Sequence, residues 1–189
     1  MIYLASASER RQELLKQIGI TFVTLAPDID EAPRPFEAPH AYVQRMAHEK
    51  AAAGARERDR RGLAAAPVLG ADTIVVHDGA ILHKPDRVSA ARAALCRLSG
   101  AEHAVYTAVC LSGRAHHEVV VRSDVTFKAL SEAEIDAYCA TGEPIGKAGG
   151  YAIQGRAALF VTRLSGSYSG VVGLPLYECG QLLAAEGLL

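Results

Sequence analysis

The chain has 189 residues, of which half are hydrophobic and 22% are charged, a composition typical of a globular domain with a substantial core. The formal net charge is −1 at pH 7, so bulk nucleic-acid binding is not expected and an anionic partner would need a local positive patch. No stretch has the length of a transmembrane helix and no signal peptide is visible, so we expect a cytoplasmic location and no membrane partner.

The first predicted elements are a strand over residues 2–5 and a helix that ends before Gly19. The segment between them carries two hydroxyls and two guanidiniums, beside the unpaired N–H groups and positive dipole end of the helix. These groups favour a multiply charged phosphate, because arginine forks match phosphate oxygens. In the structural alternative, Ser8 is only an N-cap and the arginines are a solvated face. The residues concerned are Ser6, Ser8, Arg10 and Arg11.

A second strand is predicted over residues 20–25, and it leads into an acidic, proline-rich loop over residues 26–35. The loop carboxylates are either solvated charges or oxygen ligands for a hard cation, and Glu31 is the candidate ligand. A helix follows over residues 41–56, with Lys50 and Arg45 expected near its exposed side. The charge run over residues 56–62 is predicted to be a solvated loop.

The strongest strand signal is the apolar, β-branched run over residues 67–76, which predicts a central strand. Asp72 lies in its middle, where a charged carboxylate is costly without a partner. Structural pairing explains many such carboxylates, and a catalytic or metal-binding role explains many others. A tight Asp-Gly turn follows, and Lys84 would lie close to Asp72 if Asp72 pairs near the foot of this hairpin.

In the second half of the chain, the patterns predict a helix over residues 89–98, a hairpin of residues 103–111 and 118–127, and a helix that begins with a capping box at Ser131. The glycine-rich segment 142–155 is not a Walker A loop, but it would bring backbone N–H groups close to a phosphate, unless it is a structural loop. A strand over residues 158–164, a return to the sheet at residues 171–172 and a helix over residues 176–185 complete the prediction. The four scattered cysteines predict reduced, mostly buried thiols, and His116 and His117 are expected at the surface.

Taken together, these stretches resemble the Maf family of nucleoside triphosphate pyrophosphatases over nearly the whole chain. The resemblance rests on many short motifs in the same order. They are Ser6-x-Ser8-x-Arg10-Arg11, Glu31, Lys50, Gly70-Ala71-Asp72-Thr73, Lys84-Pro85, Ser99-Gly100 with His103 and Thr107, Lys147-Ala148-Gly149, Ile153-Gln154-Gly155, Gly166-Ser167-Tyr168 and Val172-Gly173-Leu174-Pro175.

The resemblance implies one α/β domain over residues 1–189, similar to inosine triphosphatases. A long, mixed, twisted sheet is flanked by helices, and two lobes enclose a central cleft. It also implies hydrolysis of a nucleoside triphosphate to the monophosphate and pyrophosphate with a divalent cation, Mg²⁺ or Mn²⁺. The partner is then a small-molecule nucleotide, and a homodimer is expected by family analogy alone.

The resemblance also assigns roles to single residues. Asp72, Lys50 and Lys84 are expected to be catalytic, and Asp72 and Glu31 to bind the metal. Arg11, Thr73 and Gln154 match the positions that select dTTP and UTP in one branch of the family. The expected phosphate-binding residues are Ser6, Ser8, Arg10, Arg11 and Lys147.

The sequence departs from the family pattern at two positions. Glu9 replaces a common proline, and Gly146 replaces an acid that often precedes the lysine of Lys147-Ala148-Gly149. Because of the second departure, a bound metal would depend on Asp72 and Glu31 for its ligands.

The resemblance implies that the function is dTTP and UTP hydrolysis, with a role in cleansing the nucleotide pool and in cell-division arrest. The alternatives are a 7-methyl-GTP or broad non-standard triphosphate pyrophosphatase, or a non-enzymatic nucleotide-sensing regulator.

Overall fold

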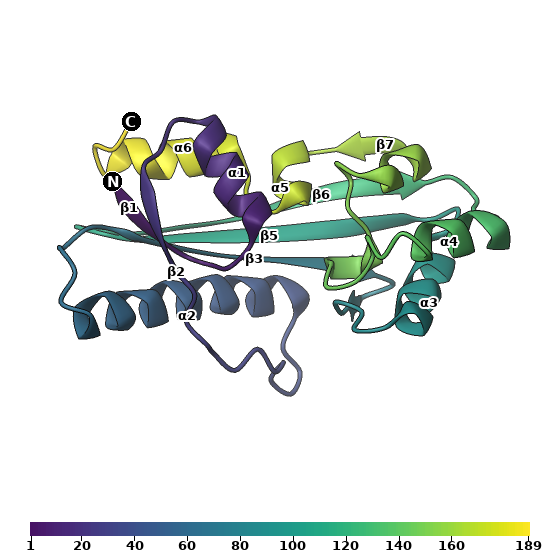
Figure 1. Cartoon of the computed structure of the whole chain (residues 1–189), viewed down its shortest axis with the longest axis horizontal. Helices are drawn as coiled ribbons and strands as arrows, with labels where there is room; N and C mark the ends of the chain where they lie inside the picture. The colour runs from purple at the N-terminus through teal and green to yellow at the C-terminus, as the bar shows by residue number, and fades with distance from the viewer. The chain divides into compact units, whose positions relative to one another are not determined.

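The computed structural model describes residues 1–189 and shows a seven-stranded mixed sheet flanked by helices (Figure 1). The strand order is β2-β1-β3-β5-β6-β7, and β4 pairs with β3. β1 runs parallel to β2 and β3, whereas the β3–β4 and β6–β7 pairs are antiparallel. The strands are β1 (Ile2–Ala5), β2 (Phe22–Leu25), β3 (Val68–His77), β4 (Ala80–Leu82), β5 (Glu102–Ser112), β6 (His116–Phe127) and β7 (Val161–Ser165). The helices are α1 (Glu9–Gln17), α2 (Pro39–Arg60), α3 (Val88–Leu98), α4 (Glu132–Cys139), α5 (Tyr168–Val172) and α6 (Leu176–Ala185), with short 3₁₀ turns η1 (Ala148–Gly150) and η2 (Arg156–Phe160).

The chain forms two compact units, and β3, β5 and β6 contribute residues to both of them. The first unit comprises Met1–Asp72, Thr107–Val121 and Gly173–Leu189, and the second comprises Thr73–Tyr106 and Arg122–Val172. The predicted mixed sheet with flanking helices is thus confirmed, whereas the predicted cleft between two lobes stays a prediction. None of the helices is both long and apolar enough to cross a membrane.

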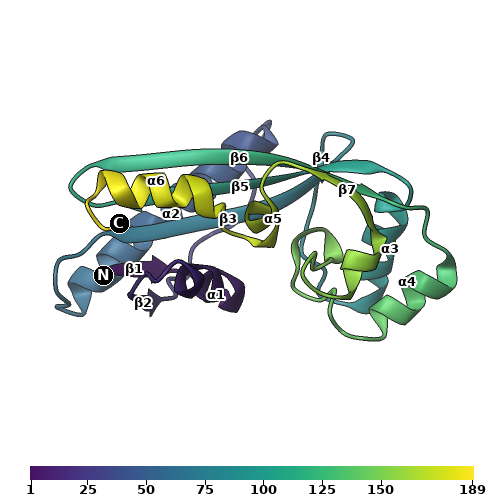
Figure 2. The ribbon, with the colours of Figure 1, turned by 90° about the horizontal axis from the view of Figure 1, so that it is seen from above.

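In the first unit, α2 covers one face of the sheet, and α1 and α6 lie on the other face (Figures 1 and 2). The long helix α2 approaches the sheet closely because β3 has a glycine where the two elements meet. A Cβ atom on Gly70 would lie 2.3 Å from the carbonyl oxygen of Ala47 and 2.4 Å from the amide nitrogen of Ala51. The glycine therefore sets the distance between α2 and the strand segment that carries Asp72.

Replacing this glycine is expected to force the helix and the strand apart. Gly70→Ala should lower the free energy of unfolding by about 1–3 kcal/mol, because the added methyl group would meet backbone atoms that cannot rotate away. Thermal unfolding followed by circular dichroism measures this change. Gly180→Ala on α6 is the matched control, because its methyl group would meet only Leu189 Cδ1 at 3.8 Å. It should be neutral or stabilise the fold by up to about 1 kcal/mol.

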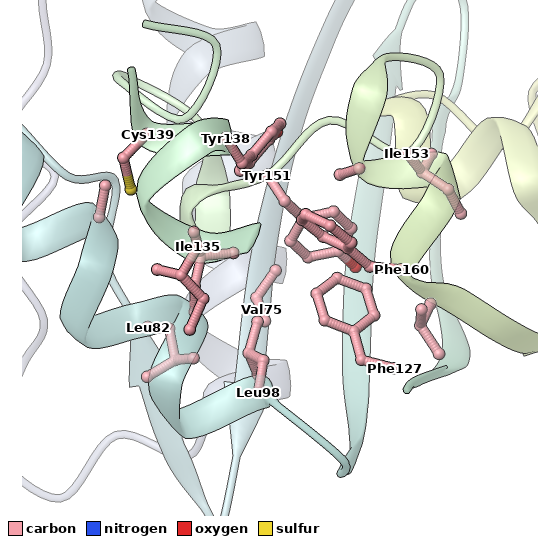
Figure 3. Close-up of a cluster of buried hydrophobic side chains, with 14 of the residues drawn as sticks. Val75, Leu82, Leu98, Phe127, Ile135, Tyr138, Cys139, Tyr151, Ile153 and Phe160 are labelled. Atoms are coloured by element: carbon pink, nitrogen blue, oxygen red, sulfur yellow. The ribbon is translucent and has the colours of Figure 1, made fainter. Parts of the chain in front are cut away.

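The second unit has an apolar core of its own, built from β3, β5 and β6 together with α3, α4 and the segments around η1 and η2 (Figure 3). Aromatic rings meet edge to face at its centre, where Phe127 contacts both Tyr151 and Phe160. His103 joins this cluster, and its Nε2 lies 2.8 Å from the hydroxyl of Tyr151. Burial lowers the pKa of His103 to about 4, so this imidazole is neutral at pH 7.

Several predicted elements are confirmed at or near their expected bounds. Asp78 and Gly79 both have positive φ, as the predicted tight turn between β3 and β4 requires. Ser131 and Glu134 form the predicted capping box at the start of α4. The cysteines are all free, and three of the four are buried.

Three predicted bounds were wrong, each because a local interaction extends or begins a helix. The charge run after residue 56 continues α2 to Arg60, since Glu57 pairs with Arg60 at 2.7 Å and with Arg61 at 2.6 Å across one helical turn. Residues 171–172 belong to α5 instead of the sheet, because Ser167 Oγ accepts the N–H of Gly170 at the start of that helix. The strand predicted over residues 158–164 begins only at Val161, after η2.

The two histidines next to the β5–β6 turn have different environments. His116 is exposed, as predicted, and lies 3.6 Å from Glu118. His117 is partly buried, and its Nε2 lies 3.1 Å from Glu186 at the end of α6. The carboxylate of Glu186 also accepts the backbone N–H groups of Ala115 and Arg114, which fixes the turn to the helix. This pairing explains why His117 is not a plain surface histidine.

Candidate active site

A buried lysine lies between two carboxylates in the first unit. Lys50 Nζ is 2.7 Å from Asp72 Oδ1 and 2.7 Å from Glu31 Oε1. Asp72 is 4% exposed and Lys50 is 9% exposed, so water screens their interaction only weakly. Stability alone is a weak reason for such a group, because desolvating the charges offsets much of their attraction. The Glu31–Lys50–Asp72 triad is therefore the centre of the candidate site.

Lys50 reaches this position from the buried face of α2, so the prediction that it lies near the exposed side was wrong. The helix packs on β1 and β3, and Asp72 lies on β3 two residues after Gly70. Asp72 is buried, as its place in the predicted central strand suggests, and its charged partner is Lys50.

The proline-rich loop brings Glu31 to the triad, and α2 holds the loop. The hydroxyl of Tyr42 donates a hydrogen bond of 2.8 Å to the backbone carbonyl of Glu31. Burial raises the pKa of Tyr42 to about 12, and the negative charges of Asp72 and Glu31 add to this shift. The phenol thus stays protonated and remains a donor. Asp30, another carboxylate of this loop, accepts the backbone N–H of Ala32 at 2.9 Å.

Arg11 is buried at the start of α1, which contradicts the interpretation of the arginines as a solvated face. Its Nε donates to the carbonyl of Gly173 at 2.8 Å, and its Nη1 donates to Ser6 Oγ at 3.2 Å. Burial lowers the pKa of Arg11, and the charge of Arg10 lowers it further, whereas Asp72 and Glu31 raise it. Arg10 and the carboxylates of Asp72 and Glu31 therefore lie within electrostatic reach of Arg11.

The N-terminus of α1 completes this group. Ser8 occupies the N-cap position, but its side chain makes no capping hydrogen bond. Its backbone N–H instead donates to Ser6 Oγ at 3.2 Å. The N-cap position of Ser8 is therefore confirmed, whereas the capping hydrogen bond of its side chain is absent. Hydroxyls, guanidiniums and a helix N-terminus lie together here, which is the chemistry expected of a phosphate site.

Two of the predicted lysines lie in segments of the second unit that a backbone hydrogen bond joins. Lys84 follows β4 and is exposed, and Lys147 precedes η1 and is half-buried. The N–H of Gly146 donates to the carbonyl of Pro85 at 2.9 Å. This bond joins the residue after Lys84 to the residue before Lys147. The predicted closeness of Lys84 to Asp72 stays a prediction.

Gln154 is exposed in the glycine-rich segment. The carboxylate of Glu143, a residue not singled out from the sequence, contacts the backbone directly after Gln154. Glu143 accepts the hydroxyl of Tyr138 at 2.7 Å and the backbone N–H of Arg156 at 3.2 Å. A Cβ atom on Gly155 would lie within 2.5 Å of this carboxylate. Glu143 therefore fixes the chain directly after Gln154. Thr73 follows Asp72 on β3, so the two side chains point to opposite faces of the strand.

The triad offers a divalent cation two carboxylates. The structure contains no cluster of three or more histidine, cysteine, aspartate or glutamate side chains that would hold a metal by itself. Asp72 and Glu31 nevertheless converge on one cationic atom, the Nζ of Lys50. Mg²⁺ commonly uses one or two carboxylates, substrate phosphates and water, so this donor set fits Mg²⁺ or the similar Mn²⁺.

The structure thus brings together a first-unit group that sequence reasoning largely anticipated. Sequence reasoning missed the role of Tyr42 in holding Glu31, and it missed the carbonyl of Gly173, which lies 162 residues from its partner Arg11. Neither contact has a signal in a single sequence. The members of the first-unit group are Ser6, Ser8, Arg10, Arg11, Glu31, Lys50 and Asp72.

Known proteins similar to this chain share its whole length. The chain is 52% identical over 196 residues to a protein from Nitrosospira multiformis named dTTP/UTP pyrophosphatase, with 99% of this chain and 95% of the relative covered. Proteins of the same name from Nitrosomonas europaea and Pseudoalteromonas atlantica are each 50% identical, with 99% and 100% of this chain and 95% and 98% of the relatives covered. Among solved structures, the chain is similar to a nucleoside-triphosphatase / dITP/XTP pyrophosphatase from Mycobacterium abscessus, with a TM-score of 0.39 and 18% identity over 68% of this chain and 74% of that one. This likeness is too weak to bear on function.

A family model described as Maf-like protein matches residues 1–186. This match covers nearly the whole chain, and it agrees with the full-length identity of about half to curated relatives. The chain therefore belongs to the family of Maf-like proteins.

Proposed function

We propose that this chain hydrolyses dTTP and UTP to the nucleoside monophosphate and pyrophosphate. The observation that carries the proposal is the Glu31–Lys50–Asp72 triad, which lies within electrostatic reach of a buried arginine at a helix N-terminus. Carboxylates next to an anion-binding site can activate a water molecule, as a general base or as ligands of a cation, for attack on a bound phosphate. The names of the curated relatives support the choice of substrates.

In this proposal, the start of α1 holds the triphosphate. Arg10, Arg11, the two serines and the backbone N–H groups of the first helical turn would neutralise the phosphate oxygens as charge shifts in the transition state. Arg11 is suited to this role because its hydrogen bonds to Gly173 and Ser6 fix its guanidinium before substrate arrives. The proposed roles of Lys84 in catalysis and of Lys147 in phosphate binding rest on the family resemblance.

Asp72 and Glu31 would hold the Mg²⁺ or Mn²⁺ ion, a role that the two carboxylates on one Nζ support. The chemistry that such an ion supplies is polarisation of phosphoryl oxygens and a lower pKa of bound water. A water oxygen forms a bond to the α-phosphorus, and the bond to the bridging oxygen breaks, so pyrophosphate leaves. If Asp72 acts as the general base, it takes the proton of the attacking water.

The base would be selected by Gln154, Thr73 and Arg11. A glutamine amide both donates and accepts, so it matches the edge of uracil or thymine, which also carries both kinds of group. Glu143 supports this assignment, because it fixes the chain on the C-terminal side of Gln154. Because these substrates are free nucleotides, we place the reaction in the cytoplasmic nucleotide pool.

The experiment that tests the proposal uses purified protein with Mg²⁺ or Mn²⁺ and a panel of dTTP, UTP, 7-methyl-GTP, dITP, ATP and GTP. Products are separated to distinguish pyrophosphate from orthophosphate. Pyrophosphate released chiefly from dTTP and UTP is the expected result. A preference for 7-methyl-GTP would keep the reaction and overturn the role of Gln154 as base reader. Nucleotide binding without any hydrolysis would overturn the enzymatic proposal in favour of a nucleotide-sensing regulator.

A further inference from the structure

Arg45, in the middle of α2, holds the proline-rich loop that carries Glu31. Its Nε donates to Glu37 Oε1 at 2.6 Å and its Nη2 donates to Glu37 Oε2 at 2.7 Å, a two-pronged fork. The same Nη2 donates to the carbonyl of Ala32 at 3.1 Å. Only 13% of the Arg45 side chain and 9% of the Glu37 side chain are exposed. The sequence prediction that Arg45 lies near the exposed side was therefore wrong.

The loop needs such an anchor because residues 26–38 form no helix or strand. Phe36 has φ of 61°, in the left-handed region, which is strained for a non-glycine residue and persists only where the surroundings enforce it. Its neighbour Glu37 is the residue held by Arg45. The backbone N–H of Arg34 also donates to Glu37 Oε2 at 3.0 Å, so the carboxylate of Glu37 joins the loop to itself and to α2.

These contacts converge on Glu31. Tyr42 binds the carbonyl of Glu31, and Arg45 binds the carbonyl of the next residue, Ala32. Lys50, further along the same helix, binds the carboxylate of Glu31. The Glu31 side chain is itself 46% exposed, so burial does not hold it in place. One helix thus fixes the backbone on which Glu31 stands as well as its charged end.

We propose that Arg45 is a positioning residue that keeps Glu31 beside Asp72 in the catalytic geometry, acting through Ala32 and Glu37 and not by contact with the nucleotide. This inference rests on the proposed function. Arg45 lowers the pKa of Glu37 to about 2, so their pair stays ionised throughout any ordinary assay range. The effect of Arg45 is therefore constant with pH near neutrality.

The first variant removes the fork and the charge. Arg45→Gln is expected to lower kcat for dTTP about 10- to 100-fold and to change KM less than about threefold, because it displaces a catalytic group without touching the phosphate site. Arg45→Lys keeps the charge but cannot form the fork, so its kcat should fall between those of the wild type and Arg45→Gln. Arg34→Gln is the matched control. Arg34 lies in the same loop, and the substitution removes its exposed ion pair with Glu49 on α2, so kcat should stay within about twofold.

The decisive comparison repeats Arg45→Gln in a Glu31→Gln background. If Arg45 acts through Glu31, the second substitution should lower kcat less than about twofold further, because coupled residues are not additive. An undiminished 10- to 100-fold loss in that background would overturn the inference. A wild-type rate in Glu31→Gln alone would instead contradict the role that the proposed function gives to Glu31.

Hydrogen exchange gives a readout that does not depend on activity. Arg45→Gln should speed exchange of the Arg34 amide, whose acceptor Glu37 loses its anchor, and leave the amides around Met46 in α2 protected. Unchanged exchange at Arg34 would overturn the inference, since the loop would then keep its place without the fork. Glu37→Gln tests the same contact from the other side and should reproduce both effects if Arg45→Gln does not fold.

Discussion

Asp72→Asn is expected to lower the turnover of dTTP and UTP about a thousandfold, the loss typical of removing a group that works at the transition state. Asparagine keeps the shape of the side chain but can neither accept a proton at this position nor offer a charged ligand to a cation. The fold should survive, because Lys50 keeps its second carboxylate partner, Glu31. The measurement is kcat at saturating nucleotide and metal, with thermal unfolding of the same sample.

A matched control comes from the far end of α2. Asp59→Asn removes a carboxylate whose side chain is 67% exposed and pairs only with its neighbour Arg58 at 2.8 Å, so turnover should not change. An Asp72→Asn enzyme that keeps more than about a tenth of wild-type turnover would count against Asp72 as base or metal ligand.

Lys50→Met is the second change with a large expected effect. Turnover should fall by at least about a hundredfold, because the substitution removes a buried positive charge between Asp72 and Glu31, the proposed metal ligands. The fold should also lose about 3 kcal/mol, since Asp72 would remain buried without its partner. Added Mg²⁺ or Mn²⁺ should restore part of this stability, because a cation bound to the native state stabilises it by mass action.

The comparison that matters is the metal-dependent shift in Tm. Without nucleotide, saturating Mn²⁺ should raise the Tm of Lys50→Met more than that of the wild type, because the ammonium no longer occupies the place between the carboxylates. Lys50→Arg keeps the charge and should respond to Mn²⁺ like the wild type. Equal shifts in Lys50→Met and the wild type would contradict the assignment of Glu31 and Asp72 as metal ligands.

The sequence was informative where local rules decide the structure. The capping box at Ser131 and the Asp-Gly turn at residues 78–79 each require particular residue types, and both were confirmed. The sequence was misleading where the type of the residues suggested one structure and their spacing another. The charge run after residue 56 suggested a loop, yet the spacing of Glu57 from its arginines favours a helix.

Lys50 shows the same conflict inside the candidate site. Val43, Met46, Ala47 and Lys50 follow helical spacing along one stripe, and all four are buried. This spacing places Lys50 on the buried face, which contradicts the prediction that Lys50 lies near the exposed side of the helix. A charged residue on an apolar helical stripe thus deserves to be treated as a site candidate and not as an exception to the stripe.

Other parts of the site had no signal in one sequence. The carbonyl of Gly173 and the forked pair of Arg45 with Glu37 depend on how distant or irregular segments are placed. Arg11 and Asp72 could be singled out as candidates from the sequence, Arg11 because it lies with two hydroxyls before a predicted helix, and Asp72 because a carboxylate in an apolar strand is costly to bury without a partner. Their neighbours were predictable only once the fold was known.

The most direct test of the proposed reaction is the fate of water oxygen. Wild-type protein is incubated with dTTP and a divalent metal in ¹⁸O-labelled water, and the products are analysed by mass spectrometry. Attack on the α-phosphorus predicts one labelled oxygen in dTMP and none in pyrophosphate. Label in pyrophosphate, or orthophosphate as the main product, would contradict the proposed reaction.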